Sequence, residues 1–276
     1  GYAYSLANLS LKVAINNVES VVFYSESFSK ESSQNEQLQK EIEEGIKNNE
    51  FEVYYQGKFD LNTNSFVGAE ALVRWNHPSK GLFSPSQFID ECEKSGLIHL
   101  LDFYVFDQVC KDLGDWKKRG RRMIPISTNF SSYDFYRPDF VDSVLKTLEE
   151  NSVHPLYIEI EVTESSTANN YFYVMSVLKR LQNADMKILM DDFGTGFSSL
   201  GNLKKYPINA IKIDKSFIDD LEMDIKSREI VQTIIQLARS LGLQSIAEGV
   251  QNEKQVKILR QLKCDQIQGF YYSKPL

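Results

Sequence analysis

Cysteine and histidine are scarce in this sequence, with three of each among 276 residues. The spacing of the cysteines is typical of neither a metal site nor a disulfide pair, so we expect free thiols in a reducing compartment; they are Cys92, Cys110 and Cys264. His77 and His154 stand beside prolines, and His99 lies far from any predicted strand end. We expect all three histidines at the surface, which argues against a zinc site.

Long hydrophobic runs are also absent. No apolar stretch approaches the roughly 18 residues that a membrane-spanning helix needs, and no secretory signal is visible at the start. We therefore expect a cytoplasmic chain, although a longer parent protein could be tethered to a membrane.

Positive charge is in deficit, since 31 Lys and Arg face 38 Asp and Glu, for a net charge of -7. Polymeric nucleic acid is a poor partner for such a surface, because phosphate binding needs clustered cations. A small anionic ligand stays possible if a metal ion supplies the local positive charge.

The first 48 residues differ from the rest. They predict the end of a helix over Leu6–Ala14, a strand over Val21–Phe28 and a helix with one apolar stripe over Ser29–Asn48. Such a segment has too little core to stand alone. We interpret positions 1–35 as the remnant of a preceding domain plus the start of a connecting helix, and positions 36–276 as the main domain. The alternative is an N-terminal decoration of that domain.

Eight β-rich runs follow, and from the second onward helical patterns separate them. The predicted strands are Phe51–Tyr55, Phe66–Trp75, Met123–Asn129, Leu156–Val162, Lys187–Met190, Ala210–Ile213, Gln244–Ala247 and Gln266–Tyr272. The predicted helices are Pro85–Arg119, Tyr133–Asn151, Tyr171–Ala184, a short piece near Ser198–Lys205, Asp224–Leu241 and Glu253–Leu262. Eight alternating units predict an α/β fold, a TIM-like (βα)8 barrel. The link between the first two strands is too short for a parallel crossover, so one strand should be antiparallel.

Polar residues of chemically useful types follow or interrupt the ends of these strands. They are Glu70, Asn129, Glu161 with Glu164, Asp191 with Asp192, Lys212, Glu248 and Gln268, while Gln56 and Arg74 sit close to the first two strands. The carboxyl ends of barrel strands converge on one face, so these side chains should meet in one pocket. Any one of these residues alone could be a helix cap, a solvated turn or an ordinary surface lysine.

The donors in this set are carboxylates and one amide, which suit Mg²⁺ or Mn²⁺. The adjacent pair Asp191 and Asp192 could serve two ions, an arrangement that clamps a phosphodiester during attack by water. Lys212 could steady the attacking hydroxide or the charge that develops on phosphorus. The sequence therefore predicts a metal-dependent phosphodiesterase.

The ordered motifs resemble the EAL-domain family of cyclic di-GMP phosphodiesterases over roughly residues 36 to 276. They include Glu70-Ala71-Leu72-Val73-Arg74, Thr128-Asn129-Phe130-Ser131, Glu161-Val162-Thr163-Glu164, Asp191-Asp192-Phe193-Gly194-Thr195-Gly196, Lys212-Ile213-Asp214, Ala247-Glu248-Gly249-Val250 and Gln268-Gly269. More weakly, the segment before them resembles the end of a GGDEF-type domain.

The resemblance implies two Mg²⁺ or Mn²⁺ ions and hydrolysis of cyclic di-GMP to linear pGpG. It implies that Glu70, Asn129, Glu161 and Asp191 bind one ion, and that Asp191 or Asp192 with Glu248 serves the other. It implies that Lys212 orients the water and that Glu248 acts as a general base if it is not a ligand. Gln268 would support the site, and Glu164 would brace the Asp191–Leu200 loop. Gln56, Leu72 and Arg74 would bind the nucleotide. A homodimer through the barrel and an upstream sensory or GGDEF-like domain are implied partners.

Two positions depart from the family pattern. Gln251 stands where a Glu is usual, and Gly57 stands where a Pro is usual. Gln251 removes a negative charge near the second metal region, and Gly57 should loosen the backbone beside the nucleotide contact. The alternatives to an active enzyme are a catalytically weak or inactive module that binds cyclic di-GMP, and an unrelated Mg²⁺-dependent barrel enzyme.

Overall fold

The computed structural model describes residues 26–163, 171–194 and 203–276, with backbone alone for residues 26–34. The chain divides into two compact units, one formed by Gly1–Phe51 with Trp75–Ile98 and the other by Glu52–Arg74 with His99–Leu276. The two units are described separately below. Within the described ranges no helix is both long enough and apolar enough to cross a membrane.

The smaller unit is organised around Trp75, which is fully buried. Its ring stacks on Phe51 and meets Phe88 edge to face, and its indole nitrogen donates to Glu50 over 3.0 Å. The elements of this unit are helix α2 (Glu26–Lys47), the end of β2 (Ser65–His77), β3 (Gly81–Phe83), the 3₁₀ turn η1 (Pro85–Gln87) and α3 (Ile89–Ser95).

This smaller unit corrects three predictions. Positions 26–28 are helical, since α2 begins at Glu26, so a strand over Val21–Phe28 is wrong there; positions 1–25 lie outside the described residues. The predicted long helix Pro85–Arg119 is broken at Gly96, whose φ of 74° ends α3. His77 is buried rather than at the surface, because its ring packs against Trp75 and Phe83.

The larger unit is a closed eight-stranded barrel. The strand order is β1-β9-β8-β7-β6-β5-β4-β2, and β1 closes the ring by pairing with β2. The strands are β1 (Phe51–Asp60), β2, β4 (Ile126–Asn129), β5 (Ile158–Thr163), β6 (Lys187–Phe193), β7 (Ala210–Ile213), β8 (Gln244–Ala247) and β9 (Gln266–Gln268). From β2 through β4, β5, β6, β7 and β8 to β9, each strand runs parallel to the next one in the ring, whereas β1 is antiparallel to β9. The predicted barrel with one reversed strand is confirmed.

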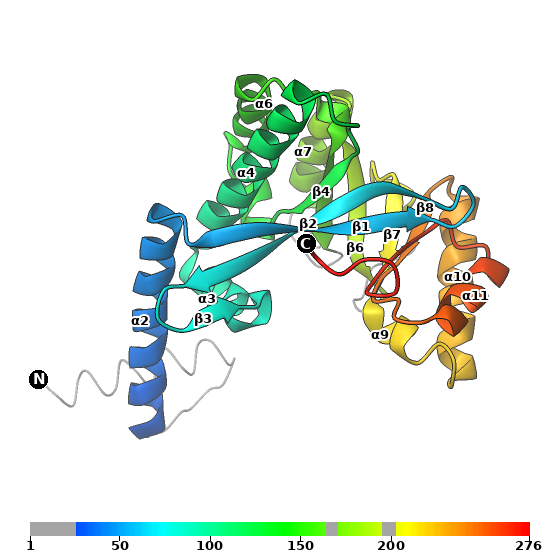
Figure 1. Cartoon of the computed structure of the whole chain (residues 1–276), viewed down its shortest axis with the longest axis horizontal. Coiled ribbons are helices and arrows are strands. Elements are labelled where there is room, and N and C mark those ends of the chain that lie inside the picture. The colour runs from blue at the N-terminus through cyan, green and yellow to red at the C-terminus, as the bar shows by residue number, and fades with distance from the viewer. Residues whose placement is uncertain (1–25, 164–170, 195–202) are drawn as a thin grey trace, which may run out of the picture. The chain divides into compact units, whose positions relative to one another are not determined.

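Helices cover the outside of this barrel. They are α4 (Ile98–Lys118), α5 (Ser132–Phe135), α6 (Phe140–Glu150), α7 (Tyr171–Asn183), α9 (Lys215–Asp219), α10 (Ile225–Ser240) and α11 (Glu253–Gln261), with the 3₁₀ turn η2 (Pro155–Tyr157) before β5. Helices α4, α6 and α7 lie together on one side of the strands, and α10 and α11 lie together on another (Figure 1). Apolar residues of these helices and of the outward strand faces form one large core, typified by Phe106, Val144, Leu178 and Ile235.

Local differences from prediction have simple causes. Strand β9 stops at Gln268 and the chain turns through Phe270 and Tyr271, so the predicted strand to Tyr272 is too long. Strand β1 continues through Gly57, and a Cβ at this position would lie only 2.6 Å from Cε1 of the Phe66 ring. Most of the helical piece predicted near Ser198–Lys205 lies outside the described residues.

Candidate active site

The ammonium group of Lys212 lies at the centre of an acidic cluster. Lys212 projects from the middle of β7 into the barrel, because side chains alternate between the two faces of a strand and its neighbours Ile211 and Ile213 join the outer core. Its side chain is 1% exposed. Four carboxylate oxygens surround the ammonium nitrogen, at 2.6 Å for Glu161, 2.7 Å for Glu248, 3.1 Å for Asp191 and 3.4 Å for Glu70.

These carboxylates come from four different strands or strand ends. Glu70 lies in β2, Glu161 in β5 and Asp191 in β6, and Glu248 directly follows β8. Parallel strands bring their carboxyl ends to one face of the barrel, which explains why residues so far apart in sequence meet. The alternative that Lys212 is an ordinary surface lysine is wrong, because the residue is buried.

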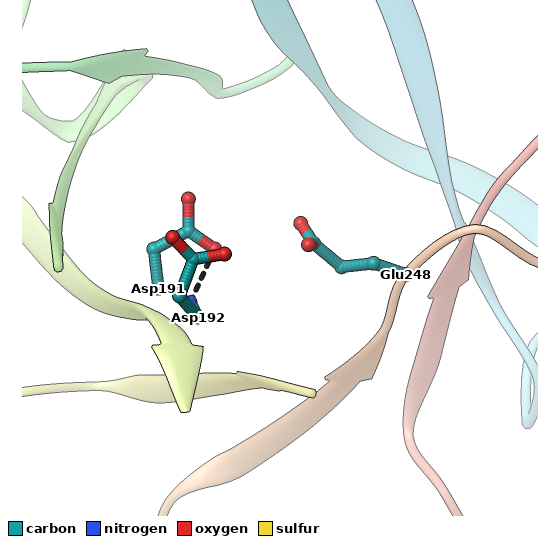
Figure 2. A group of neighbouring side chains, drawn as sticks. All are labelled: Asp191, Asp192 and Glu248. Atoms are coloured by element: carbon teal, nitrogen blue, oxygen red, sulfur yellow. Dashed lines mark hydrogen bonds between the residues drawn. The ribbon is translucent and has the colours of Figure 1, made fainter. Parts of the chain in front are cut away.

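The position of Asp192 depends on an irregularity in β6. Successive side chains of a regular strand point to opposite faces, which would separate Asp191 from Asp192. The register of β6 against β7 shifts between Met190 and Phe193, and Asp192 has a φ of 51°. Because this bulge re-aims its side chain, Asp192 shares one cluster with Asp191 and Glu248, with an oxygen from each within 4.8 Å of the others. Figure 2 shows Glu248 pointing toward the two aspartates from the neighbouring part of the barrel, and the Asp192 N–H donates to Asp191 over 2.9 Å.

Amide side chains hold Glu70 in place. Asn129, at the end of β4, donates to Glu70 Oε1 over 3.0 Å, and Gln268, at the end of β9, donates to Glu70 Oε2 over 2.5 Å. The Gln268 amide also donates to Gln56 on β1 over 3.2 Å, and Gln56 donates to the Ser273 carbonyl. A chain of hydrogen bonds therefore fixes Glu70 from two sides of the barrel.

Burial and mutual repulsion shift the pKa values of the acidic residues. Burial, with help from Glu70 and Asp191, raises the pKa of Glu161 well above its usual range against the pull of Lys212. Burial likewise raises the pKa of Glu248 to about 8, again opposed by Lys212. Burial also raises the pKa of Asp192, with Asp191 contributing. A cluster in which several carboxylates resist ionisation is typical of a site built to hold cations.

For Glu70 and for Lys212 the neighbouring charges and hydrogen bonds outweigh the effect of burial on the pKa. Burial would raise the pKa of Glu70, but Lys212 and the amides of Gln268 and Asn129 together lower it. Burial would lower the pKa of Lys212, but the surrounding carboxylates raise it well above its usual value, so the lysine stays charged.

The donor set fits divalent cations. The described ligand candidates are oxygen donors, which suit Mg²⁺ or Mn²⁺. One oxygen of Glu161, Oε1, is buried without a hydrogen-bond partner, as expected of an atom whose partner is an ion. The residues that could hold cations are Glu70, Asn129, Glu161, Asp191, Asp192 and Glu248.

A pocket of about 280 Å³ opens beside the cluster. It is lined by Gln56, Glu70, Leu72, Asp191, Lys212, Lys215, Glu248, Gly249, Gln251, Gln268, Gly269 and Phe270. Seven residues predicted for the site are therefore on its wall, and Asn129, Glu161 and Asp192 contact them or group with them.

Two predicted residues are not placed in this pocket. The guanidinium of Arg74 donates to the Val73 carbonyl over 2.8 Å and lies 5.8 Å from the centre of the Tyr54 ring, and Arg74 is not among the described lining residues. Glu164 lies outside the described residues, as does most of the loop that it was expected to brace.

The sequence reasoning missed Lys215, Gly249, Gly269 and Phe270 as parts of the wall. The two glycines directly follow Glu248 and Gln268, which was the available signal. A Cβ at position 269 would lie 2.1 Å from the Val250 carbonyl oxygen, and one at position 249 would lie 2.3 Å from Lys215 Cγ. Both positions need glycine because another part of the chain approaches so closely.

Fold and site together define a β/α-barrel protein with an acidic, oxygen-donor pocket at the carboxyl ends of its strands. The family described as EAL domain matches residues 39–275, and the chain belongs to this family.

Relatives and solved structures agree with this assignment. The chain is 39% identical over 235 residues to the signaling protein YkoW of Bacillus subtilis, covering 85% of this chain and 29% of YkoW. It is 34% identical over 254 residues to the cyclic di-GMP phosphodiesterase NbdA of Pseudomonas aeruginosa, covering 92% of this chain and 32% of NbdA. The solved structure of the PaMucR phosphodiesterase in complex with c-di-GMP matches with a TM-score of 0.83 and 36% identity, over 87% of this chain and 97% of that chain. The chain thus spans about a third of the length of these curated relatives.

Proposed function

We propose that this chain hydrolyses cyclic di-GMP to linear pGpG with the help of two divalent cations, Mg²⁺ or Mn²⁺. The observation that carries the proposal is the buried ammonium of Lys212, surrounded by Glu70, Glu161, Asp191 and Glu248, with Asp192 adjoining. Relatives named as cyclic di-GMP phosphodiesterases, and a solved c-di-GMP complex of the same fold, support this choice of substrate.

The proposed ligands divide into two groups. Glu70, Asn129, Glu161 and Asp191 would hold one ion, and Asp192 and Glu248, with Asp191 shared, would hold the other. When bound, such ions polarise the phosphodiester and make water a stronger acid and nucleophile.

The chain's own residues then supply orientation and proton transfer. Hydrolysis forms one bond from a water oxygen to phosphorus and breaks one bond from phosphorus to a ribose oxygen; the water loses a proton, and the departing ribose oxygen gains one. Lys212, which contacts both Glu248 and Asp191, would orient that water and stabilise the charge that develops on phosphorus. Glu248 would accept the proton if it does not serve as a ligand. Gln268 would keep Glu70 in its ligating orientation.

The remaining proposals concern nucleotide binding, the loop after β6 and possible partner domains. Gln56 and Leu72, on the pocket wall, would contact the nucleotide, while Arg74 would have to leave the Val73 carbonyl to reach a phosphate. Glu164 would brace the loop after β6. We retain the homodimer through the barrel and the upstream sensory or GGDEF-like domain as proposals, along with the division at position 35.

The proposal is tested by incubating the purified chain with cyclic di-GMP and either Mg²⁺ or Mn²⁺ and separating the products chromatographically. We expect linear pGpG from the wild type and none from Glu70→Gln. Glu253→Gln, which changes an exposed glutamate paired with Lys257, is the matched control and should leave turnover unchanged. Tight binding without turnover under both metals would instead assign the chain to the binding modules, and Gln251 would be the first residue to revert to Glu.

A further inference from the structure

Lys215 is the second cation of the pocket wall. Among the described residues that line the pocket, Lys212 and Lys215 are the only positively charged side chains. The ammonium of Lys212 already has carboxylate oxygens of Glu161, Glu248 and Asp191 within 3.1 Å. An ammonium has three N–H donors, and at Lys212 all three face the acidic cluster, where the reacting phosphate would lie, so Lys212 is not the cation for a second phosphate.

The stem of Lys215 is fixed while its charged end is loosely held. A Cβ at position 249 would lie 2.3 Å from Lys215 Cγ and 2.9 Å from its Cβ and Cδ, so the aliphatic chain lies against the bare backbone of Gly249. The ammonium has one ion-pair partner in the described chain, Asp219, at 3.8 Å, which is beyond hydrogen-bond distance. That carboxylate also accepts from the Gln251 amide at 3.4 Å.

Lys111 is a surface lysine of this chain that forms a close ion pair, and it serves as a comparison for Lys215. It also pairs with a carboxylate four residues away, Asp107, although here the acid comes first in the chain. Its exposure of 57% is close to the 55% of Lys215, and its nitrogen lies 2.6 Å from the carboxylate. The longer distance at Lys215 leaves its N–H donors available to a ligand.

We propose that Lys215 binds the second phosphate of the ligand, the one that does not undergo hydrolysis. This inference rests on the proposed function, because a cyclic dinucleotide carries two phosphodiesters and the acidic cluster with its cations can engage one of them at a time. The second phosphate then needs a cation on the pocket wall, and Lys215 is placed between Gly249 and Gln251 to supply it. A charge-assisted hydrogen bond of this kind adds affinity to ground state and transition state alike.

The test compares Lys215→Met with Lys111→Met. In EDTA, where turnover stops, calorimetry should show that Lys215→Met weakens cyclic di-GMP binding by about tenfold while Lys111→Met stays within about twofold of wild type. With metal present, Lys215→Met should raise KM by a similar factor and leave kcat nearly unchanged, and Lys215→Arg should restore KM. Thermal unfolding confirms that the variants are folded.

The outcomes separate this inference from the proposed function. Equal binding by wild type and Lys215→Met overturns the role of Lys215 and leaves the function intact. If wild type binds no cyclic di-GMP either in EDTA or with metal present, the proposed function fails, and a titration with inorganic pyrophosphate decides about Lys215. Loss of pyrophosphate binding in Lys215→Met then retains Lys215 as an anion contact, whereas no difference, or no binding by wild type, overturns it.

Discussion

The ammonium nitrogen of Lys212 lies 2.6 Å from Oε2 of Glu161, and both side chains are shielded from solvent. Buried pairs of this kind are costly to break, because the remaining charge loses its partner. If Lys212 is removed, the charges that remain are the several carboxylates around it. Its loss should therefore lower both the stability of the fold and the activity.

Lys212→Met is therefore expected to abolish most activity, by at least about 100-fold, and to lower the melting temperature in EDTA by several degrees. Added Mg²⁺ or Mn²⁺ should raise the melting temperature of this variant more than that of wild type, because the metal replaces the missing positive charge. Differential scanning fluorimetry with and without metal measures the effect, with Lys111→Met as control. An unchanged melting temperature in EDTA would contradict the central role given to this lysine.

Glu161→Gln should separate stability from metal binding. Burial and the neighbouring Glu70 raise the pKa of Glu161 well above its usual range, so the ionised carboxylate costs the metal-free fold free energy at neutral pH. The neutral amide removes this cost, and we expect a melting temperature in EDTA equal to or above that of wild type. The rise in melting temperature on adding Mn²⁺ should shrink sharply, with at least a tenfold weaker apparent affinity. A lower melting temperature in EDTA together with normal metal affinity is the opposite of this expectation.

Gly249→Ala tests the close approach of Lys215. Gly249 and Gly120 share a φ of 66°, but a Cβ at Gly120 meets nothing within 4 Å. We expect Gly120→Ala to cost about 1 kcal/mol from the left-handed backbone alone, and Gly249→Ala to cost about 1–3 kcal/mol more from steric overlap. Urea unfolding measures both. Adding Lys215→Ala should recover most of the extra loss at position 249, and equal losses at the two glycines would show that the overlap is relieved at no cost.

Asp102→Asn should change how stability depends on pH. Asp102 is buried, accepts from the Ser131 N–H over 2.9 Å, and has a pKa raised well above its usual value by burial and by the adjacent Asp134 carboxylate. The folded state therefore holds a proton that the unfolded chain releases, so wild-type stability falls as pH rises from about 4 toward the folded-state pKa. The asparagine keeps the acceptor and removes the titration.

The melting temperature of Asp102→Asn should consequently exceed that of wild type by a margin that grows from pH 5 to pH 8. Asp115→Asn, at an exposed position, should follow the wild-type curve. A constant difference between Asp102→Asn and wild type across this pH range would exclude the proton-linked explanation.

Much of the barrel follows from local patterns. Short β-rich runs such as Ala210–Ile213 and Gln244–Ala247 coincide with β7 and β8, because a strand enclosed by helices must be apolar on its outer face wherever it lies. The reversed strand β1 was predictable from a link too short for a crossover. The motif order likewise identified nearly every acidic residue of the cluster before any geometry was known.

Long-range packing decided the rest. Burial of His77 depends on the Trp75 and Phe83 rings, and Pro78 beside it suggested only a turn. The neighbouring Pro85–Arg119 pattern gave no sign that Gly96 would adopt a left-handed backbone and divide it.

The sequence by itself determined which donors are available: carboxylates, amides and a lysine at the ends of barrel strands. Tertiary structure alone decided how they are used. The β6 bulge turns Asp192 toward Asp191 and Glu248. The closed barrel gives Lys212 four carboxylate neighbours. The aliphatic part of Lys215 lies against the backbone of Gly249 at the pocket wall. The physical reason is that residue type is set position by position, whereas distance and burial arise only when strands distant in sequence are brought together.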